Sequence, residues 1–231
     1  MTIDIARTTL IEIDIQNDFC PGGTLAVDRG DEVIGPLNAL ADGFTRRGGR
    51  VIATADWHPA GHISFASSHA GRKAGDVLDT QVLWPDHCVQ GSSGADFHKA
   101  LDLKSVNLII RKGFRKNLDS YSAFFENDRK TPTGLEGYLK FLGIETVILG
   151  GLATDYCVLY SALDAAAIGL RTIVLTDAMR GVGFPEGSVE RAFKSMHDAG
   201  VILASSVEVL AGIHSLLTTD STDRRRGERR I

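Results

Sequence analysis

The stretch VILGGLATDYCVLYSALDAAAIGL, residues 147–170, decides the fold of this chain. A run of apolar, mostly β-branched residues stops at two glycines, and the spacing of a helix follows after a short polar turn. This order predicts a buried strand over 146–151 and a helix over 155–168. The helix opens with a cysteine, Cys157, in its first turn. A strand that leads into a helix is the repeating unit of a parallel α/β sheet.

The rest of the chain repeats this order of strand and helix. Apolar runs predict five further strands, at 8–15, 50–56, 106–112, 171–178 and 201–205. Helical patterns predict further helices at 32–47, 134–142, 188–199 and 207–217. Several strands are apolar almost throughout, as strands buried on both faces are. We therefore expect one α/β domain, a three-layer α/β/α sandwich around a mostly parallel sheet of six strands.

The composition excludes several classes of protein. Of the 231 residues, 43% are hydrophobic and 23% are charged, which suffices for a sizeable core. The net charge of −4 gives no reason to expect nucleic acid as a partner. No window reaches the length of a membrane span and no signal peptide is visible, so we expect no membrane partner. Three cysteines are an odd and sparse set, which indicates a reducing compartment, the cytoplasm.

The last residues differ from the rest of the chain. Residues 218–231, TTDSTDRRRGERRI, hold five arginines against three acidic residues and almost no apolar side chain. Such a segment lacks the hydrophobicity that a packed core requires. We expect a domain over 1–217 and a disordered basic tail over 218–231, with a docking role for the tail as the alternative.

Charged side chains and a thiol follow three of the predicted strands. Asp14 ends the first strand, Lys112 ends the third, and Cys157 follows the fourth. Ligands of parallel sheets bind beyond the carboxyl ends of the strands, so these groups are expected to meet there. Free N–H groups at a helix start favour a thiolate and lower the pKa of a cysteine when a cation is near. A buried structural cysteine and surface charges at strand ends are the alternatives. Neither Cys20 nor Cys88 follows a strand or opens a helix.

A second cluster has the character of a metal site. The segment ADWHPAGHISF, residues 55–65, places Asp56, His58 and His62 directly after a strand, and LWPDHC, residues 83–88, adds His87. One carboxylate with two or three imidazoles suits Zn, Fe or Mn. The alternative is that these are polar histidines of a surface loop.

Taken together, these segments resemble a known family. IDIQNDFCPGG (13–23), the two metal-like segments, RKG (111–113) and GGLATDYCV (150–158) occur in the order found in nicotinamidases of the cysteine hydrolase (isochorismatase-like) superfamily. The resemblance extends from Leu10 to about Leu210. It implies the isochorismatase-like hydrolase fold, and the metal-like segments distinguish nicotinamidases from metal-free relatives.

The resemblance also implies a role for individual residues. It assigns a catalytic triad to Asp14, Lys112 and Cys157, and an oxyanion hole to the N–H groups of Ala153 and Cys157. It assigns the metal to Asp56, His58 and His87, with His62 as a fourth ligand in some members and Ser64 reaching the metal through water. It assigns the substrate pocket to Phe19, Trp84, Tyr121 and Leu152, and a cis peptide bond to Leu152–Ala153. Tyr156 departs from the family, since many members have histidine there.

The activity implied is hydrolysis of nicotinamide to nicotinate and ammonia through a cysteine thioester, a step of NAD salvage. One divalent metal ion is expected, Zn first and Fe or Mn as alternatives, and pyrazinamide is expected to be accepted as well. One alternative is a related amidohydrolase for a carbamoyl or ureido substrate, but Phe19 and Trp84 suit a flat aromatic ring. The other is a non-catalytic metal-binding module, which leaves Asp14, Lys112 and Cys157 unexplained. The sequence leaves open whether the protein is a monomer or a homo-oligomer.

Overall fold

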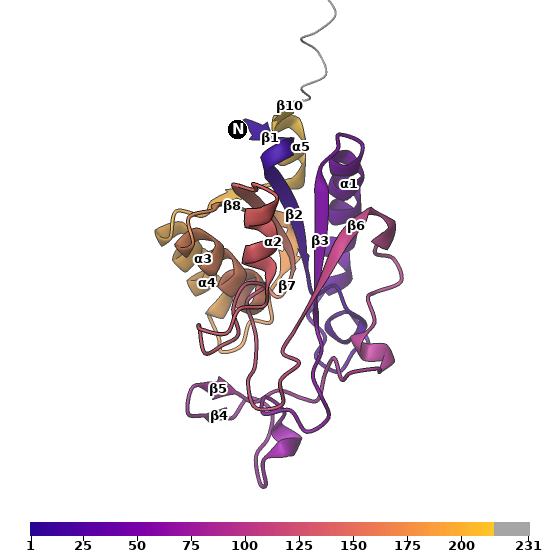
Figure 1. Cartoon of the computed structure of the whole chain (residues 1–231). Helices are drawn as coiled ribbons and strands as arrows, with labels where there is room; N and C mark the ends of the chain where they lie inside the picture. Colours follow the sequence, from indigo (N-terminus) through magenta and orange to yellow (C-terminus); the bar gives the residue numbers. More distant parts are fainter. Residues whose placement is uncertain (215–231) are drawn as a thin grey trace, which may run out of the picture.

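Six strands form the central sheet of this computed structural model, which describes residues 1–214. They are β2 (Thr8–Ile13), β3 (Arg50–Asp56), β6 (Val106–Lys112), β7 (Thr146–Leu152), β8 (Arg171–Arg180) and β9 (Ile202–Ala204). Their order across the sheet is β6-β3-β2-β7-β8-β9, and every neighbouring pair is parallel (Figure 1). The predicted sheet of six parallel strands is therefore confirmed.

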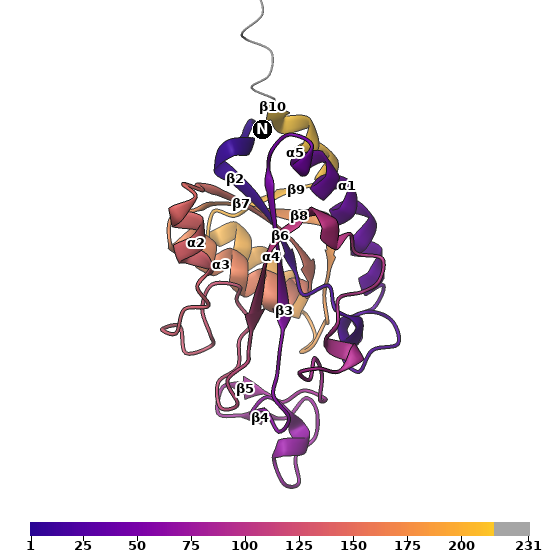
Figure 2. The same cartoon turned by 45° about the vertical axis from the view of Figure 1, so that its right-hand side comes forward.

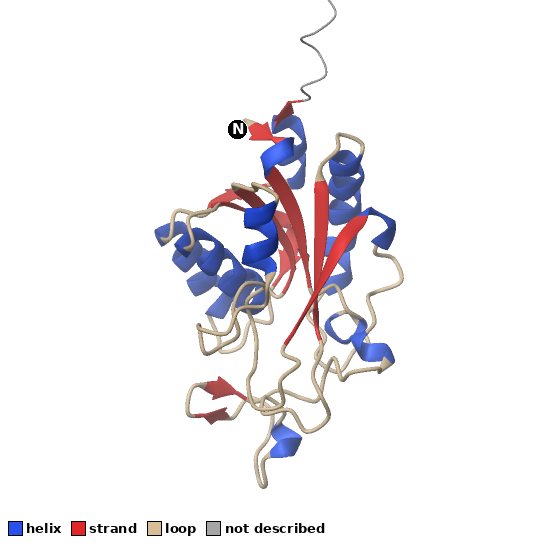
Figure 3. Ribbon diagram, in the orientation of Figure 1, coloured by secondary structure: helices blue, strands red, loops and turns tan. Residues whose placement is uncertain are grey.

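Helices cover both faces of the sheet, which confirms the predicted three layers (Figure 3). One face carries α1 (Ile34–Thr45) and α5 (Ser206–Gly212). The other carries α2 (Leu135–Phe141), α3 (Leu159–Ala167) and α4 (Ser188–Asp198). The predicted helix at 32–47 begins with a 3₁₀ turn, Gly30–Val33, and Pro36 lies in the first turn of α1, where a missing N–H costs nothing.

The apolar runs of the sequence reflect burial on both faces. In β2, Leu10 packs into the core beneath α1, together with Leu37 of that helix. The next residue, Ile11, packs into the opposite core together with Leu139 of α2. Successive side chains of a strand point to opposite faces, so a strand covered on both sides is apolar at nearly every position.

The predicted helix at 207–217 is wrong at its end. Helix α5 ends at Gly212, and β10 (Ile213–His214) then pairs in parallel with β1 (Ile3–Asp4), a strand that the sequence pattern did not predict. Gly212 permits this pairing, because a Cβ there would collide with the carbonyl oxygen of Met1. The predicted tail, 218–231, lies outside the described residues.

The carboxyl ends of the strands meet at the lower edge of the sheet in Figure 1. The long connection between β3 and β6 extends beyond this edge and contains a small hairpin of β4 (Val77–Leu78) and β5 (Gln81–Val82) (Figure 2). Among residues 1–214, no helix has the length and apolarity that crossing a bilayer requires.

Candidate active site

The turn that carries Cys157 connects β7 to α3. The peptide bond between Leu152 and Ala153 is cis, as the family resemblance implied. Ala153 is the N-cap of a π-helix, Thr154–Val158, which continues as α3. The helix thus begins one residue before the predicted start at 155. Cys157 lies in this first turn, where backbone N–H groups lack helical partners, and its side chain is 5% exposed.

Gly151 is required by the neighbouring strand. Its φ of 131° is disfavoured for residues with a side chain, and a Cβ would collide with the carbonyl oxygen of Ile13 in β2. This close approach brings the end of β7 against the strand that leads to Asp14.

Lys112 joins the thiol to two carboxylates. Its ammonium nitrogen lies 3.4 Å from Cys157 Sγ, 2.8 Å from Asp14 Oδ2 and 2.5 Å from Asp56 Oδ1. Asp14 is held by the hydroxyl of Thr54, which donates to its Oδ1 over 2.6 Å. All three members of the predicted triad are buried. Three strand ends that are far apart in sequence therefore meet as predicted.

Burial determines the protonation of these groups. It raises the pKa of the Cys157 thiol well above its ordinary value, against the opposing effect of Lys112. The expectation of a lowered thiol pKa is therefore not met in this closed site, where desolvation outweighs the nearby cation. Burial also raises the pKa of the Asp14 carboxyl, although Lys112 acts to lower it. A protonated thiol beside a carboxylate of raised pKa is suited to proton transfer between the two.

The predicted metal ligands also converge. Asp56, His58 and His87 offer ligand atoms that all lie within 4.8 Å of one another, and all three side chains are buried. Because Asp56 also contacts Lys112, this cluster and the triad form one continuous polar centre. Burial acts against ionisation of Asp56, but Lys112 and His58 outweigh it and lower its pKa, so the carboxylate is charged.

His58 and His87 each keep one ring nitrogen free to bind a metal ion. The Nδ1 atoms of His58 and His87 lie 2.8 Å from the carbonyl oxygens of Gly113 and Pro85, which leaves each Nε2 available. Burial and the neighbouring His58 lower the pKa of His87 to about 4, so that ring is neutral near pH 7. One carboxylate with two imidazole nitrogens fits a divalent cation such as Zn, Fe or Mn.

His62 lies directly beside this cluster. Its ring stacks on His58 with centroids 4.3 Å apart, and its Nδ1 lies 2.7 Å from the hydroxyl of Ser64. Asp119 joins them, because ligand atoms of His58, His62 and Asp119 also lie within 4.8 Å of one another. Sequence reasoning missed Asp119, which lies in an irregular loop after β6 with no pattern to mark it.

Aromatic rings border the centre. Phe19 contacts His87, with centroids 5.6 Å apart, and Trp84 meets Tyr156 edge to face at 4.9 Å. The Trp84 indole donates to the Tyr121 hydroxyl over 3.2 Å. Tyr156 therefore belongs to this wall, although sequence reasoning noted it only as a departure. Leu152 packs in the core on the α1 side, in the same cluster of buried side chains as Phe19.

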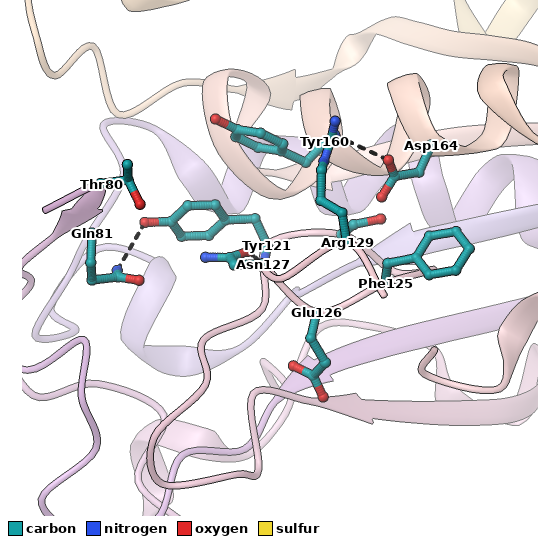
Figure 4. Close-up of a pocket in the computed structure, with 10 residues that line it drawn as sticks. Thr80, Gln81, Tyr121, Phe125, Glu126, Asn127, Arg129, Tyr160 and Asp164 are labelled. Carbon is teal, nitrogen blue, oxygen red and sulfur yellow. Dashed lines mark hydrogen bonds and ion pairs between the residues drawn. The ribbon is translucent and has the colours of Figure 1, made fainter. Parts of the chain in front are cut away.

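Tyr121 also faces a separate cavity of about 220 Å³ (Figure 4). There its hydroxyl accepts a hydrogen bond from Gln81 over 3.2 Å, and Arg129 pairs with Asp164 of α3. Cys157, Lys112 and Asp14 do not line this cavity. The Cys157 thiol is instead buried.

The chain matches the isochorismatase domain family over residues 8–208. It belongs to the isochorismatase family. A nicotinamidase of Acinetobacter baylyi is 48% identical to this chain over 205 residues, which cover 87% of this chain and 94% of that protein. The superfamily that the sequence resemblance indicated is thus confirmed.

Two solved structures have a fold similar to that of this chain. A nicotinamidase–pyrazinamidase of Acinetobacter baumanii superposes with a TM-score of 0.84 and 46% identity, covering 88% of this chain and 98% of that one. A pyrazinamidase of Pyrococcus horikoshii, in complex with zinc, superposes with a TM-score of 0.73 and 34% identity, covering 86% and 99%.

Proposed function

We propose that this protein hydrolyses nicotinamide to nicotinate and ammonia. The observation that carries the proposal is the position of Lys112, whose ammonium contacts the Cys157 thiol, the Asp14 carboxylate and the Asp56 carboxylate together. One cation thus joins a nucleophile, a base and a cluster of metal-ligating side chains. The similarity to nicotinamidases supports the choice of an aromatic carboxamide as substrate.

The first half of the reaction forms a thioester. Asp14 accepts the thiol proton, and the Cys157 sulfur attacks the carboxamide carbon, so that a C–S bond forms and the carbonyl π electrons move to oxygen. The N–H groups of Ala153 and Cys157 donate to this oxyanion, an interaction worth roughly 3–4 kcal/mol per donor in comparable sites. Lys112 keeps the sulfur and the carboxylate in place while the charge moves between them.

The second half releases both products. Asp14 returns its proton to the amide nitrogen, the C–N bond breaks, and ammonia leaves the thioester. A water molecule then attacks the thioester carbon while Asp14 accepts its proton. The C–S bond breaks, Asp14 returns its proton to the sulfur, and the acid departs with the water oxygen in its carboxyl group and loses its remaining proton to solvent as nicotinate.

A divalent metal ion belongs to this proposal, with Asp56, His58 and His87 as its ligands, His62 as a further one and Ser64 beside it. Zinc is our first choice because of the zinc-bound pyrazinamidase relative, with Fe or Mn as alternatives. When bound, such an ion supplies Lewis acidity for a ligand nitrogen or water. The rings of Phe19 and Trp84 suit any flat azine, so we expect pyrazinamide to be hydrolysed too.

The test is ammonia release from nicotinamide by the purified protein, before and after treatment with a chelator and again after metal is restored. We expect release that falls with the chelator and returns with the metal. We also expect benzamide, which lacks a ring nitrogen, to be a poor substrate. A folded, metal-loaded sample that releases no ammonia would refute the proposal and direct attention to carbamoyl and ureido compounds.

A further inference from the structure

Asp155 lies two residues before Cys157, yet its carboxylate is bound to a different part of the chain. Its Oδ1 accepts from the backbone N–H of Val182 over 2.9 Å. Its Oδ2 accepts from the N–H of Gly183 over 2.9 Å and from the hydroxyl of Ser188 over 2.5 Å. The side chain is buried, so these donors replace the water that a carboxylate would otherwise need.

Two of these donors, Val182 and Gly183, lie in the segment between β8 and α4, and the third, Ser188, is the first residue of α4. We call residues 181–187 the strap. Arg180, the last residue of β8, pairs in register with Leu152, so the strap starts beside the turn that carries the thiol. The fit is tight at Gly181, where a Cβ would collide with the side chain of Val189 and lie 3.2 Å from Asp155 Oδ1.

The strap also reaches the aromatic wall. The Tyr156 hydroxyl donates to the Phe184 carbonyl over 2.5 Å, and the rings of Phe184 and Trp84 meet with centroids 6.3 Å apart. Phe184 is 41% exposed, whereas Trp84, which it contacts, and Cys157 are buried. The strap therefore forms part of the cover over the candidate site, and two consecutive residues of the catalytic turn hold it.

We propose that Asp155 is a positioning residue, which ties the strap to the turn so that closure over Trp84 and the placement of the N–H groups of Ala153 and Cys157 occur together. This inference rests on the proposed amide hydrolysis. It assigns different effects to neighbouring residues. Asp155 acts on the geometry of the turn and hence on kcat, whereas the Tyr156 hydroxyl acts on the cover and hence on KM.

The first test is Asp155→Asn. An amide has one accepting oxygen and places an NH₂ group against an N–H donor, so at least one strap contact is lost. A displacement of about 1 Å at the reacting groups costs on the order of 100-fold in rate. We expect kcat for nicotinamide to fall by about 10- to 100-fold, with KM changed less than about 3-fold. The matched control is Asp164→Asn, which alters a carboxylate of α3 that pairs with Arg129 instead.

The second test separates the hydroxyl from the carboxylate. Tyr156→Phe keeps the ring against Trp84 and removes the bond to Phe184. We expect KM to rise by about 3- to 10-fold, with kcat within about 2-fold of wild type. Tyr160→Phe, which removes a hydroxyl from the same helix away from the strap, is the control. Equal effects of Tyr156→Phe and Tyr160→Phe would contradict the role of the Tyr156 hydroxyl in holding the strap.

A spectroscopic readout does not depend on turnover. The chain has two tryptophans, so Trp57→Phe leaves Trp84 as the only tryptophan, whose emission can be excited selectively over that of the tyrosines. In this background we expect Asp155→Asn to shift Trp84 emission to longer wavelength and to increase its quenching by acrylamide, because the strap no longer covers the ring. Emission, quenching and kcat identical to those of Asp164→Asn would overturn the proposal.

A smaller change keeps the test valid if Asp155→Asn does not fold. Ser188→Ala removes one of the three donors, and Ser206→Ala is its match, since the Ser206 hydroxyl donates to Asp177 over 2.6 Å at the start of α5. We expect kcat to fall by about 3- to 10-fold for Ser188→Ala alone. If wild type releases no ammonia, the proposed function fails while the Trp84 readout still decides whether Asp155 holds the strap.

Discussion

The ammonium nitrogen of Lys112 lies 3.4 Å from the sulfur of Cys157, in a site where both side chains are buried. A buried lysine is costly unless it is paired, and this one meets Asp14 and Asp56. Burial acts to lower the pKa of Lys112, but the two carboxylates outweigh it and raise the pKa well above its ordinary value. The lysine therefore remains charged and holds two acids and a thiol within reach of one another.

Replacing Lys112 should cost stability as well as activity. Lys112→Met leaves Asp14 and Asp56 buried without their cation, and breaking such a pair typically lowers the free energy of unfolding by about 3–5 kcal/mol. Cys157→Ala should abolish ammonia release at a smaller cost in stability, because no charge loses its partner. Urea denaturation of both variants measures the difference. A Lys112→Met protein as stable as Cys157→Ala would show that the ion pairs are not what holds this centre together.

Loss of a metal ligand should be visible without an assay of turnover. His58→Ala removes an imidazole that offers its free Nε2 beside Asp56, so we expect less zinc per protein chain and a smaller rise in Tm on adding zinc. His197→Ala, which removes an exposed imidazole far from the cluster, is the control. Zinc content and Tm are measured after dialysis against a chelator and re-addition. Equal zinc uptake by both variants would contradict the assignment of His58.

The sequence predicted those parts of the fold that follow from periodicity. The six strands and the helices between them were found because burial on both faces leaves an uninterrupted apolar run, as at Leu10 and Ile11. The pairing of β1 with β10 was missed because each strand has only two residues, too short for any period to appear. The end of α5 was misplaced because the apolar pattern of the helix continues past Gly212 to Ile213.

The residues of the candidate site also divide into those that the sequence predicted and those that it did not. Asp14, Lys112 and Cys157 were predictable because each follows a strand, and parallel strands end at one edge. Asp119 and Asp155 were not, because their neighbours in space come from loops whose paths no sequence rule fixes. The raised pKa of Cys157 was also beyond reach, since it depends on how completely the thiol is buried.

Gly151 offers a test of the geometry that brings β7 against β2. Gly151→Ala places a methyl group against the carbonyl oxygen of Ile13 and requires a φ of 131°, so strand and turn must move apart. We expect a loss of more than about 2 kcal/mol in the free energy of unfolding, together with a loss of activity. Gly169→Ala is the control, because its φ is also positive, at 89°, while a Cβ there meets open space. Chemical denaturation of both variants separates the collision from the backbone strain that they share.

The buried carboxyl of Glu12 should make the stability of the protein depend on pH. Its carboxyl is buried near the end of β2, and neither oxygen has a hydrogen-bond partner among the described residues. Burial, with a smaller effect from the charge of Asp102, raises its pKa from 4.5 to about 8. The folded protein therefore holds a proton that the unfolded chain has lost between these two pH values. Stability from this group is complete below pH 4.5 and is lost as pH rises towards 8, by up to about 1.4 kcal/mol per pH unit.

Glu12→Gln keeps the shape of the side chain and removes its titration, so the variant should be more stable than wild type at pH 8, by a margin that shrinks towards pH 5. Urea denaturation at several pH values between 5 and 9 measures this margin. Glu190→Gln, in the exposed first turn of α4, should keep the pH dependence of wild type. A Glu12→Gln protein whose stability falls with pH as steeply as that of wild type would show that another group is responsible for the loss.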